Sequence, residues 1–235
     1  MPVGSGILTL YFKVLFMTDE KSLEDLREIR QMMDRSTRFI SLSGWSGVAA
    51  GTCALIASWF AHGIIARAGI NKDSFRITAP GISPENKVSV ETYLGQQLLH
   101  VALITLVAAV TLAFLFTWLR TRRTNTKIWS PVTRKVLWAL ALPLVVGGIY
   151  LLEVLHSGAW GLMAPGSLLF YGLALVGASR YTVSEIRFLG YGQLLTGIVA
   201  LFFPGYGLYF WAFGFGLLHI VYGLLMWWKH ERVTG

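Results

Sequence analysis

Six long apolar runs make up most of the chain and are separated by shorter polar segments. They cover residues 39–61, 93–119, 136–155, 159–179, 188–203 and 206–228. A helix needs about 20 residues to cross a hydrocarbon core of roughly 30 Å, and the runs reach or approach that length. A transmembrane barrel would need segments of about ten residues with alternating polarity, which these runs lack. The pattern predicts an all-α membrane protein, a bundle of six transmembrane helices.

The composition agrees with this fold class. Of the 235 residues, 54% are hydrophobic and only 14% are charged. Soluble domains carry about 25% charged residues, so this chain has too few to cover a globule in water. The single cysteine, Cys53, excludes an internal disulfide and a cysteine-based zinc cluster.

The charges divide unequally between the two sides of the predicted spans. Sixteen of the twenty basic residues and eight of the twelve acidic residues lie on the side of the two termini, which therefore carries the whole net charge of +8. Because lysine and arginine remain on the cytoplasmic side, both termini are predicted to be cytoplasmic. Attraction to anionic lipid headgroups accounts for this charge, and no nucleic-acid partner is needed.

Residues 17–38 are predicted to form a cytoplasmic amphipathic helix before the first span. Ser22 and Asp25 fit a capping box. One side of the helix carries an apolar stripe formed by Leu23, Leu26, Ile29 and Met33. The helix either binds a partner or a second copy, or lies on the membrane surface as a lead-in to the first span. Residues 229–235 are expected to form a cytoplasmic tail.

Residues 1–16 fit none of these elements. They lack the basic segment and the small-residue cleavage site of a signal peptide. Met17 opens a more ordinary start, so residues 1–16 are interpreted as a non-native or disordered extension. Whether Met1 or Met17 is the true start stays open.

The segment 62–92 is predicted to be a long outer loop. Within it, "SFRIT" and "KVSVET" alternate in polarity like two short strands, which predicts a small two-stranded lid. Loops of this length are usually functional or disordered.

Proline and small residues inside the spans predict local features of the bundle. Pro143 and Pro165 each remove a backbone hydrogen bond and are expected to kink the third and fourth spans. Ser43, Gly47 and Gly51 are spaced four residues apart, which permits close approach of another helix. This face is a candidate for helix packing or for self-association.

Four ionisable residues are expected near the outer ends of the spans: His62, His100, Glu153 and His156. At about 1.5 Å per residue, Glu153 and His100 lie roughly 27 and 30 Å from the inner surface. One interpretation is a zinc site or an acid–base site formed by these residues, with Glu153, His156 and His100 as the catalytic candidates. The other is that "EVLHSG" is a polar turn, in which Gly158 bends the chain. No other cofactor is expected.

His219 is predicted to lie near the middle of the membrane, roughly 15 Å from the inner surface by helical rise. An ionisable residue at that depth is a functional-site hypothesis. The alternative is a neutral imidazole that bonds to Tyr191, to Gln193 or to a backbone carbonyl and so holds helices together. Gln193 is the second polar residue expected at this depth.

Two segments, "SLEDLREIRQMMDRSTRFISLSGWSG" and "LFFPGYGLYFWAFGFGLLHIVYG", resemble a group of bacterial membrane proteins with six spans and no assigned activity. The likeness covers roughly residues 20–228. It implies the bacterial inner membrane and a regulatory or accessory role, since such proteins tend to be encoded beside a small winged-helix regulator. We therefore expect a non-enzymatic, partner-binding membrane protein. The alternatives are a small-molecule transporter or channel and, third, a metal-dependent membrane hydrolase of the outer leaflet.

Overall fold

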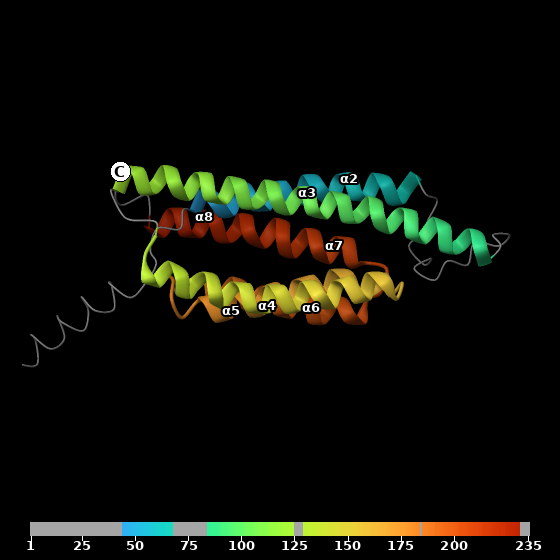
Figure 1. Cartoon of the computed structure of the whole chain (residues 1–235). Coiled ribbons are helices and arrows are strands. Elements are labelled where there is room, and N and C mark those ends of the chain that lie inside the picture. Colours follow the sequence, from blue (N-terminus) through green and yellow to red (C-terminus); the bar gives the residue numbers. More distant parts are fainter. Residues whose placement is uncertain (1–43, 68–83, 125–128, 184, 231–235) are drawn as a thin grey trace, which may run out of the picture. The chain divides into compact units, whose positions relative to one another are not determined.

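The computed structural model describes residues 44–67, 84–124, 129–183 and 185–230. The predictions for residues 1–43, for the strand at 74–78 and for most of the tail lie outside these residues. The described elements are α2 (Gly44–Arg67), α3 (Pro84–Thr124), α4 (Pro131–His156), η1 (Trp160–Leu162), α5 (Met163–Ala178), α6 (Ile186–Phe202), α7 (Gly207–Trp211), η2 (Ala212–Leu218) and α8 (His219–His230). Here η1 is a 3₁₀-helix and η2 is a π-helix. Figure 1 shows these helices without a strand among them.

Five helical segments are long and apolar enough to cross a membrane, namely Gly44–Arg67, Tyr93–Arg122, Pro131–His156, Trp160–Ala178 and Gly207–Lys229. The last of these joins α7, η2 and α8. The helix α6 is also apolar but has only 17 residues, which gives a length of about 26 Å at 1.5 Å per residue. The prediction of an all-α protein with several membrane-compatible helices is confirmed, and five of the six predicted spans reach the required length.

The exposed surface of these helices is itself apolar. Trp59, Phe202 and Trp138 are 81%, 75% and 73% exposed, and they are only three of many large apolar side chains on the outside. Soluble monomers rarely present continuous apolar surface of this extent to water. The surface suits a hydrocarbon environment, in agreement with the sequence pattern.

The helix α3 begins earlier than the sequence predicts. Residues 62–67 belong to α2, and α3 starts at Pro84, so "KVSVET" at 87–92 is helical and its interpretation as a strand is wrong. Adding a residue to an existing helix costs far less than starting a new element. The long apolar helix that follows therefore extends through this weakly alternating segment to Pro84, a residue that favours the first helical position.

The two interior prolines differ in their positions. Pro143 lies inside α4, which is helical on both sides of it. Pro165 is the third residue of α5, because the preceding residues 160–162 form the separate 3₁₀-turn η1. The first four amide groups of a helix have no partner within the helix, so a proline at this position removes no hydrogen bond. Pro165 thus lies in the first turn of α5 and not in its interior.

The segment "EVLHSG" ends α4 in a turn. Gly158 has φ of +70°, and the amide groups of Gly158 and Ala159 donate to the carbonyls of Leu155 and Val154 at 3.3 and 3.0 Å. This pair of bonds is a Schellman motif, in which a residue with positive φ satisfies the last carbonyls of a helix. The turn interpretation of this segment is confirmed.

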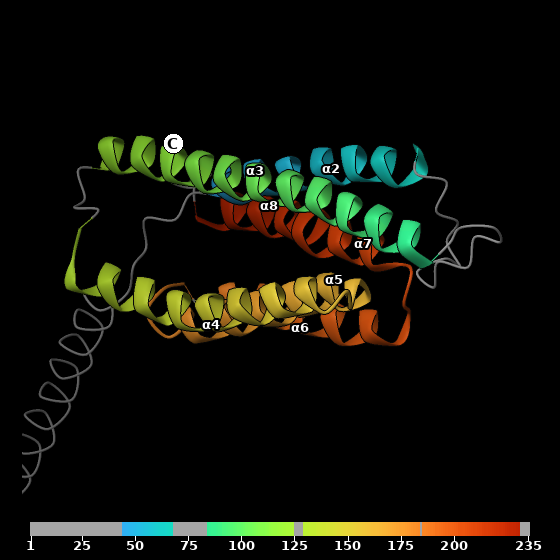
Figure 2. The ribbon, with the colours of Figure 1, turned by 45° about the vertical axis from the view of Figure 1, so that its right-hand side comes forward.

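The helices form two groups, which Figures 1 and 2 show from directions 45° apart. In one group, α2 packs along α3 and along α8. In the other, α5 packs between α4 and α6. Contacts of α5 with α7 and of α6 with η2 connect the two groups.

Glycine allows the closest of these helix contacts. A Cβ atom on Gly223 of α8 would lie 2.6 Å from the carbonyl oxygen of Gly44 in α2, and one on Gly44 would lie 2.5 Å from that of Gly223. Gly172 of α5 and Gly190 of α6 face each other in the same reciprocal way at 3.0 Å. Lipid gives little hydrophobic drive for helix association, so close backbone packing at small residues supplies much of it.

Gly47 and Gly51 of α2 also lie against the last span of the same chain. A Cβ atom on Gly47 would be 3.2 Å from the carbonyl oxygen of His219, and one on Gly51 would be 2.6 Å from that of Gly216. The expected close packing of this face is confirmed, but a helix of the same chain fills it. Gly47 and Gly51 are therefore not free to bind a second copy, and Ser43 lies outside the described residues.

Candidate functional site: a polar cluster inside the helix bundle

His219 is buried where the π-helix η2 meets α8. Only 6% of it is exposed. Its Nδ1 atom lies 3.1 Å from the carbonyl oxygen of Gly214, and its Nε2 atom lies 2.8 Å from the hydroxyl oxygen of Tyr171 in α5. Both ring nitrogens of this histidine are thus engaged by groups of the same chain.

The partners of the ring fix the position of its proton. A carbonyl oxygen can only accept, so Nδ1 of His219 carries the hydrogen and donates it to Gly214. In the neutral imidazole Nε2 then accepts, and the hydroxyl of Tyr171 is its donor. The second of these bonds joins α8 to α5, which belong to different helix groups.

Gln193 of α6 completes the cluster from a third side. It is fully buried, and its Nε2 atom donates to the same carbonyl of Gly214 at 2.7 Å. The distance from this atom to Nδ1 of His219 is 3.4 Å. Both of these nitrogens are donors here, so they share one acceptor and do not bond to each other. Within the described part of the chain, Oε1 of Gln193 has no hydrogen-bond partner.

Local sequence explains why the carbonyl of Gly214 can serve both donors. It lies in the π-helical turn "AFGFGLL", in which the regular pattern of backbone bonds is interrupted. A Cβ atom on Gly214 would collide with Cδ2 of Leu168 and would lie 2.7 Å from Oε1 of Gln193. A larger residue would therefore push α5 and α6 away from this turn.

Aromatic rings close the cluster on another side. Phe215 stacks on His219 with ring centroids 6.0 Å apart and an interplanar angle of 18°. The same ring lies 5.1 Å from Tyr171 and 5.0 Å from Trp211. The cluster is thus enclosed by side chains, and its hydrogen bonds connect the last span to α5 and α6.

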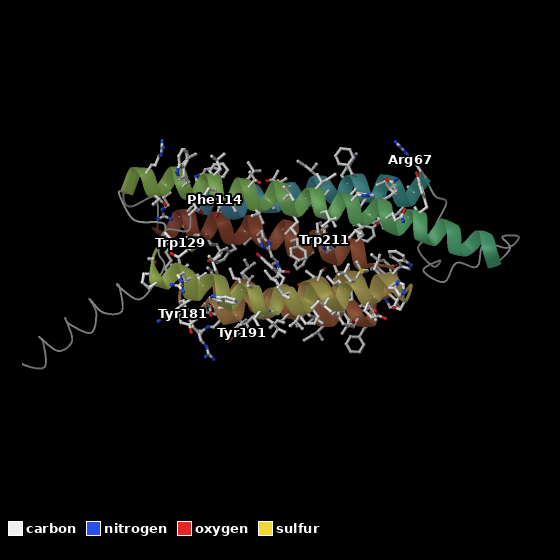
Figure 3. All side chains as sticks on the ribbon, viewed as in Figure 1. Arg67, Phe114, Trp129, Tyr181, Tyr191 and Trp211 are labelled. Atoms are coloured by element: carbon white, nitrogen blue, oxygen red, sulfur yellow. The ribbon has the colours of Figure 1, made fainter. Side chains whose placement is uncertain are left out.

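These contacts decide between the partners predicted for His219. A backbone carbonyl is one partner, as expected, and Gln193 shares that carbonyl. Tyr191 is 49% exposed, lies at the outer side of the helices in Figure 3, and is not a partner. The actual aromatic partner, Tyr171, was missed by the sequence analysis. Its signal was its position well inside an apolar run, whereas most aromatic residues with a polar atom lie near the ends of the runs.

The four outer candidates lie on three different helices. His62 is on α2, with its ring 6.4 Å from that of Tyr209, His100 is on α3, and Glu153 and His156 are in the last turn of α4. All four side chains are exposed. In the described ranges, no three His, Cys, Asp or Glu residues are arranged so that they could hold a metal ion, and the structure does not bring these four together.

Comparisons with protein-family models, with curated proteins and with solved structures found no match to this chain. The resemblance to bacterial six-span proteins therefore stays an expectation. Function is therefore inferred from the chemistry of the chain itself.

Proposed function

We propose that this chain is a six-span protein of the bacterial inner membrane, with both termini in the cytoplasm, and that it acts as a non-enzymatic accessory protein by binding a partner in the membrane. The helix α6 is the sixth span. Its 17 residues fall short of the usual length, and local thinning of the bilayer accommodates a short span at modest cost. An even number of spans places both termini on one side.

The positions of the basic residues support this orientation. Arg122 lies in the last turn of α3, Arg134 and Lys135 lie in the first two turns of α4, and Arg187 lies in the first turn of α6. These helix ends lie on one side because consecutive helices run in opposite directions. Figure 3 shows Trp129 and Tyr181 at this end, away from Arg67. By the positive-inside rule this end faces the cytoplasm.

The polar cluster supports a structural role for His219. Its two ring nitrogens and the amide nitrogen of Gln193 are satisfied within the chain. A transport path at this depth would need polar groups that are free to meet a substrate. The cluster instead connects three helices, as hydrogen bonds between membrane helices commonly do.

The observation that carries the proposal is a polar stripe on the exposed side of α3. Gln96, His100 and Thr111 all lie on this side and are exposed. Thr111 bonds to the carbonyl of Val107, whereas Gln96 and His100 have no hydrogen-bond partner in the described part of the chain. Gln96 and His100 lie near the outer end of the span, where an exposed polar side chain meets either water or a facing polar group.

A helix of another membrane protein would supply the missing partners of this stripe. Gln96 and a neutral His100 can each donate and accept a hydrogen bond, so a polar side chain on a facing helix can pair with either. Between the polar residues the stripe carries Leu103 and Val107, which are 49% and 65% exposed and would pack against that helix. Residues 17–38 would add a contact on the cytoplasmic side.

Site-specific photocrosslinking in bacterial membranes tests this proposal. A photoreactive residue at Leu103, within the stripe, is compared with one at Leu195, which is exposed on α6. We expect an adduct of discrete mass from position 103 only. The same adduct should disappear when Gln96→Leu and His100→Leu are introduced, because the facing helix then loses its hydrogen bonds.

Three results would contradict the proposal: no protein adduct at position 103, identical adducts at both positions, or an adduct that persists after both polar side chains are removed. An adduct of twice the chain mass would identify the partner as a second copy.

A further inference from the structure

A cavity of about 530 Å³, largely open to the surface, lies beside the first turns of α4. Tyr181, from the turn between α5 and α6, lines this cavity together with five residues of one face of α4. The α4 residues are Pro131, Arg134, Lys135, Trp138 and Ala139. The volume is within the range of about 300–1,000 Å³ that is usual for small-ligand sites. Neither the polar cluster nor the stripe on α3 includes any of these residues.

The charge in this cavity is positive, and no carboxylate of the described residues pairs with it. Glu185 is the only acidic residue among the described residues at this end of the helices, and it pairs with Lys229. Arg134 and Lys135 form no ion pair with any described residue. The cavity therefore presents a guanidinium and an ammonium group without a carboxylate to neutralise them.

The available donors suit a phosphate group. The planar guanidinium of Arg134 can bind two phosphate oxygens at once, and the ammonium of Lys135 adds a further charge-assisted bond. The hydroxyl of Tyr181 can donate as well. Two cations together favour a phosphate over a neutral or zwitterionic group.

The aromatic residues indicate what kind of phosphate-bearing ligand the cavity would bind. Trp138 is 73% exposed and lies one turn further along α4 than Arg134. Tryptophan and tyrosine rings prefer the boundary between headgroups and hydrocarbon, where one side of the ring is wet and the other apolar. A ligand held by Arg134 and Lys135 would thus have its apolar part beside Trp138, in the hydrocarbon.

We propose that this cavity binds the phosphate of an anionic phospholipid headgroup. Basic pockets between membrane helices on the cytoplasmic side bind anionic headgroups in this way. Free phosphate is the other source of the same chemistry. The proposal concerns a site that is separate from the partner-binding stripe and does not depend on it.

Native mass spectrometry of the full chain, purified in detergent, tests the site. Binding of phosphatidylglycerol is measured against phosphatidylcholine, with inorganic phosphate alone as a separate arm. The test variant is Arg134→Gln with Lys135→Gln. The control variant is Arg122→Gln with Arg187→Gln, which removes the same charge from the same end but from outside the cavity. Both pairs are exposed, and far-UV circular dichroism checks that helix content is retained.

We expect phosphatidylglycerol to bind in preference to phosphatidylcholine and to bind about 30-fold more weakly to the cavity variant. This factor follows from roughly fivefold per basic residue near a membrane surface. The control variant should keep nearly all of the affinity. Binding of inorganic phosphate without lipid, lost in the cavity variant alone, would support the same site with free phosphate as its ligand. Equal losses in the two variants, or equal binding of the two lipids, would overturn the proposal.

Discussion

Two partly buried tyrosines, Tyr171 and Tyr222, allow the contribution of one hydrogen bond of the polar cluster to be measured by the same substitution at both positions. The hydroxyl of Tyr171 bonds to Nε2 of His219 at 2.8 Å and so joins α5 to α8. The hydroxyl of Tyr222, in α8, is buried and has no hydrogen-bond partner in the described part of the chain. Replacing either tyrosine by phenylalanine removes one oxygen and leaves the ring in place.

The expected effects on stability have different signs. Hydrogen bonds between membrane helices contribute about 0.6 kcal/mol on average and up to about 1.7 kcal/mol. Tyr171→Phe also leaves Nε2 of His219 without a donor in an enclosed site, so we expect a loss of about 1–2 kcal/mol. Tyr222→Phe removes a polar atom that is buried without a bond, so stability should be unchanged or rise by up to about 1 kcal/mol.

The assay is reversible unfolding of the full chain in mixed micelles, titrated with a denaturing detergent and followed by far-UV circular dichroism. A double-mutant cycle combines Tyr171→Phe with His219→Leu. Because both changes remove the same bond, the double variant should lose less than the sum of the single losses, with a coupling of about 0.6–1.7 kcal/mol.

Equal effects of Tyr171→Phe and Tyr222→Phe would refute this reasoning, as would strictly additive effects in the cycle. In either case the bond between Tyr171 and His219 would contribute nothing to holding α5 against α8.

Three further predictions concern helix packing and helix capping, and the same unfolding assay measures the change in stability in each case. Gly223→Ala should cost about 1–3 kcal/mol of stability, because its methyl group would meet the α2 backbone at 2.6 Å. The control Gly63→Ala has open space around it and should be neutral or stabilise the protein by up to about 1 kcal/mol. Similar losses in the two variants would contradict the close contact. Gly95→Ala should also destabilise the protein, because the added carbon would collide with the ring of Trp160, and Trp160→Ala should remove most of this penalty. A penalty that persists without the ring would argue against that contact. Ser130→Ala should cost about 0.5–2 kcal/mol, since its hydroxyl caps α4, and no change would mean that the cap does not stabilise the helix.

The sequence predicted those structural features that depend only on residues close together in the chain. The helical class follows from the long apolar runs, because each such segment must satisfy its own backbone in lipid. The turn at Gly158 is equally local, since a residue with positive φ ends the helix there. An error arose at residues 87–92, because the neighbouring helix extends through that segment.

Only some members of the polar cluster around His219 could be predicted from the sequence. Counting residues along each run predicted similar depths for His219 and Gln193, and the structure shows that both are buried and share the carbonyl of Gly214 as acceptor. The π-helical turn around Gly214 and the choice of Tyr171 over Tyr191 were not predictable, because they depend on how α5, α6 and α8 are rotated against one another. The outward direction of Gln96 and His100 likewise depends on which side of α3 meets α2.

The amino-acid sequence was enough to predict the fold class, the approximate positions of the membrane-compatible helices and the uneven spacing of charged residues along the chain. Each of these depends on how a single segment partitions between water and lipid, which its own composition decides. Tertiary structure alone decided that the glycines of α2 meet α8 of the same chain, that Tyr171 bonds a histidine 48 residues away, and that Arg134 and Lys135 line one cavity. Lipid surrounds every helix with much the same apolar environment, so the choice of neighbours depends on the shape and the polar atoms of facing surfaces, which no single segment contains.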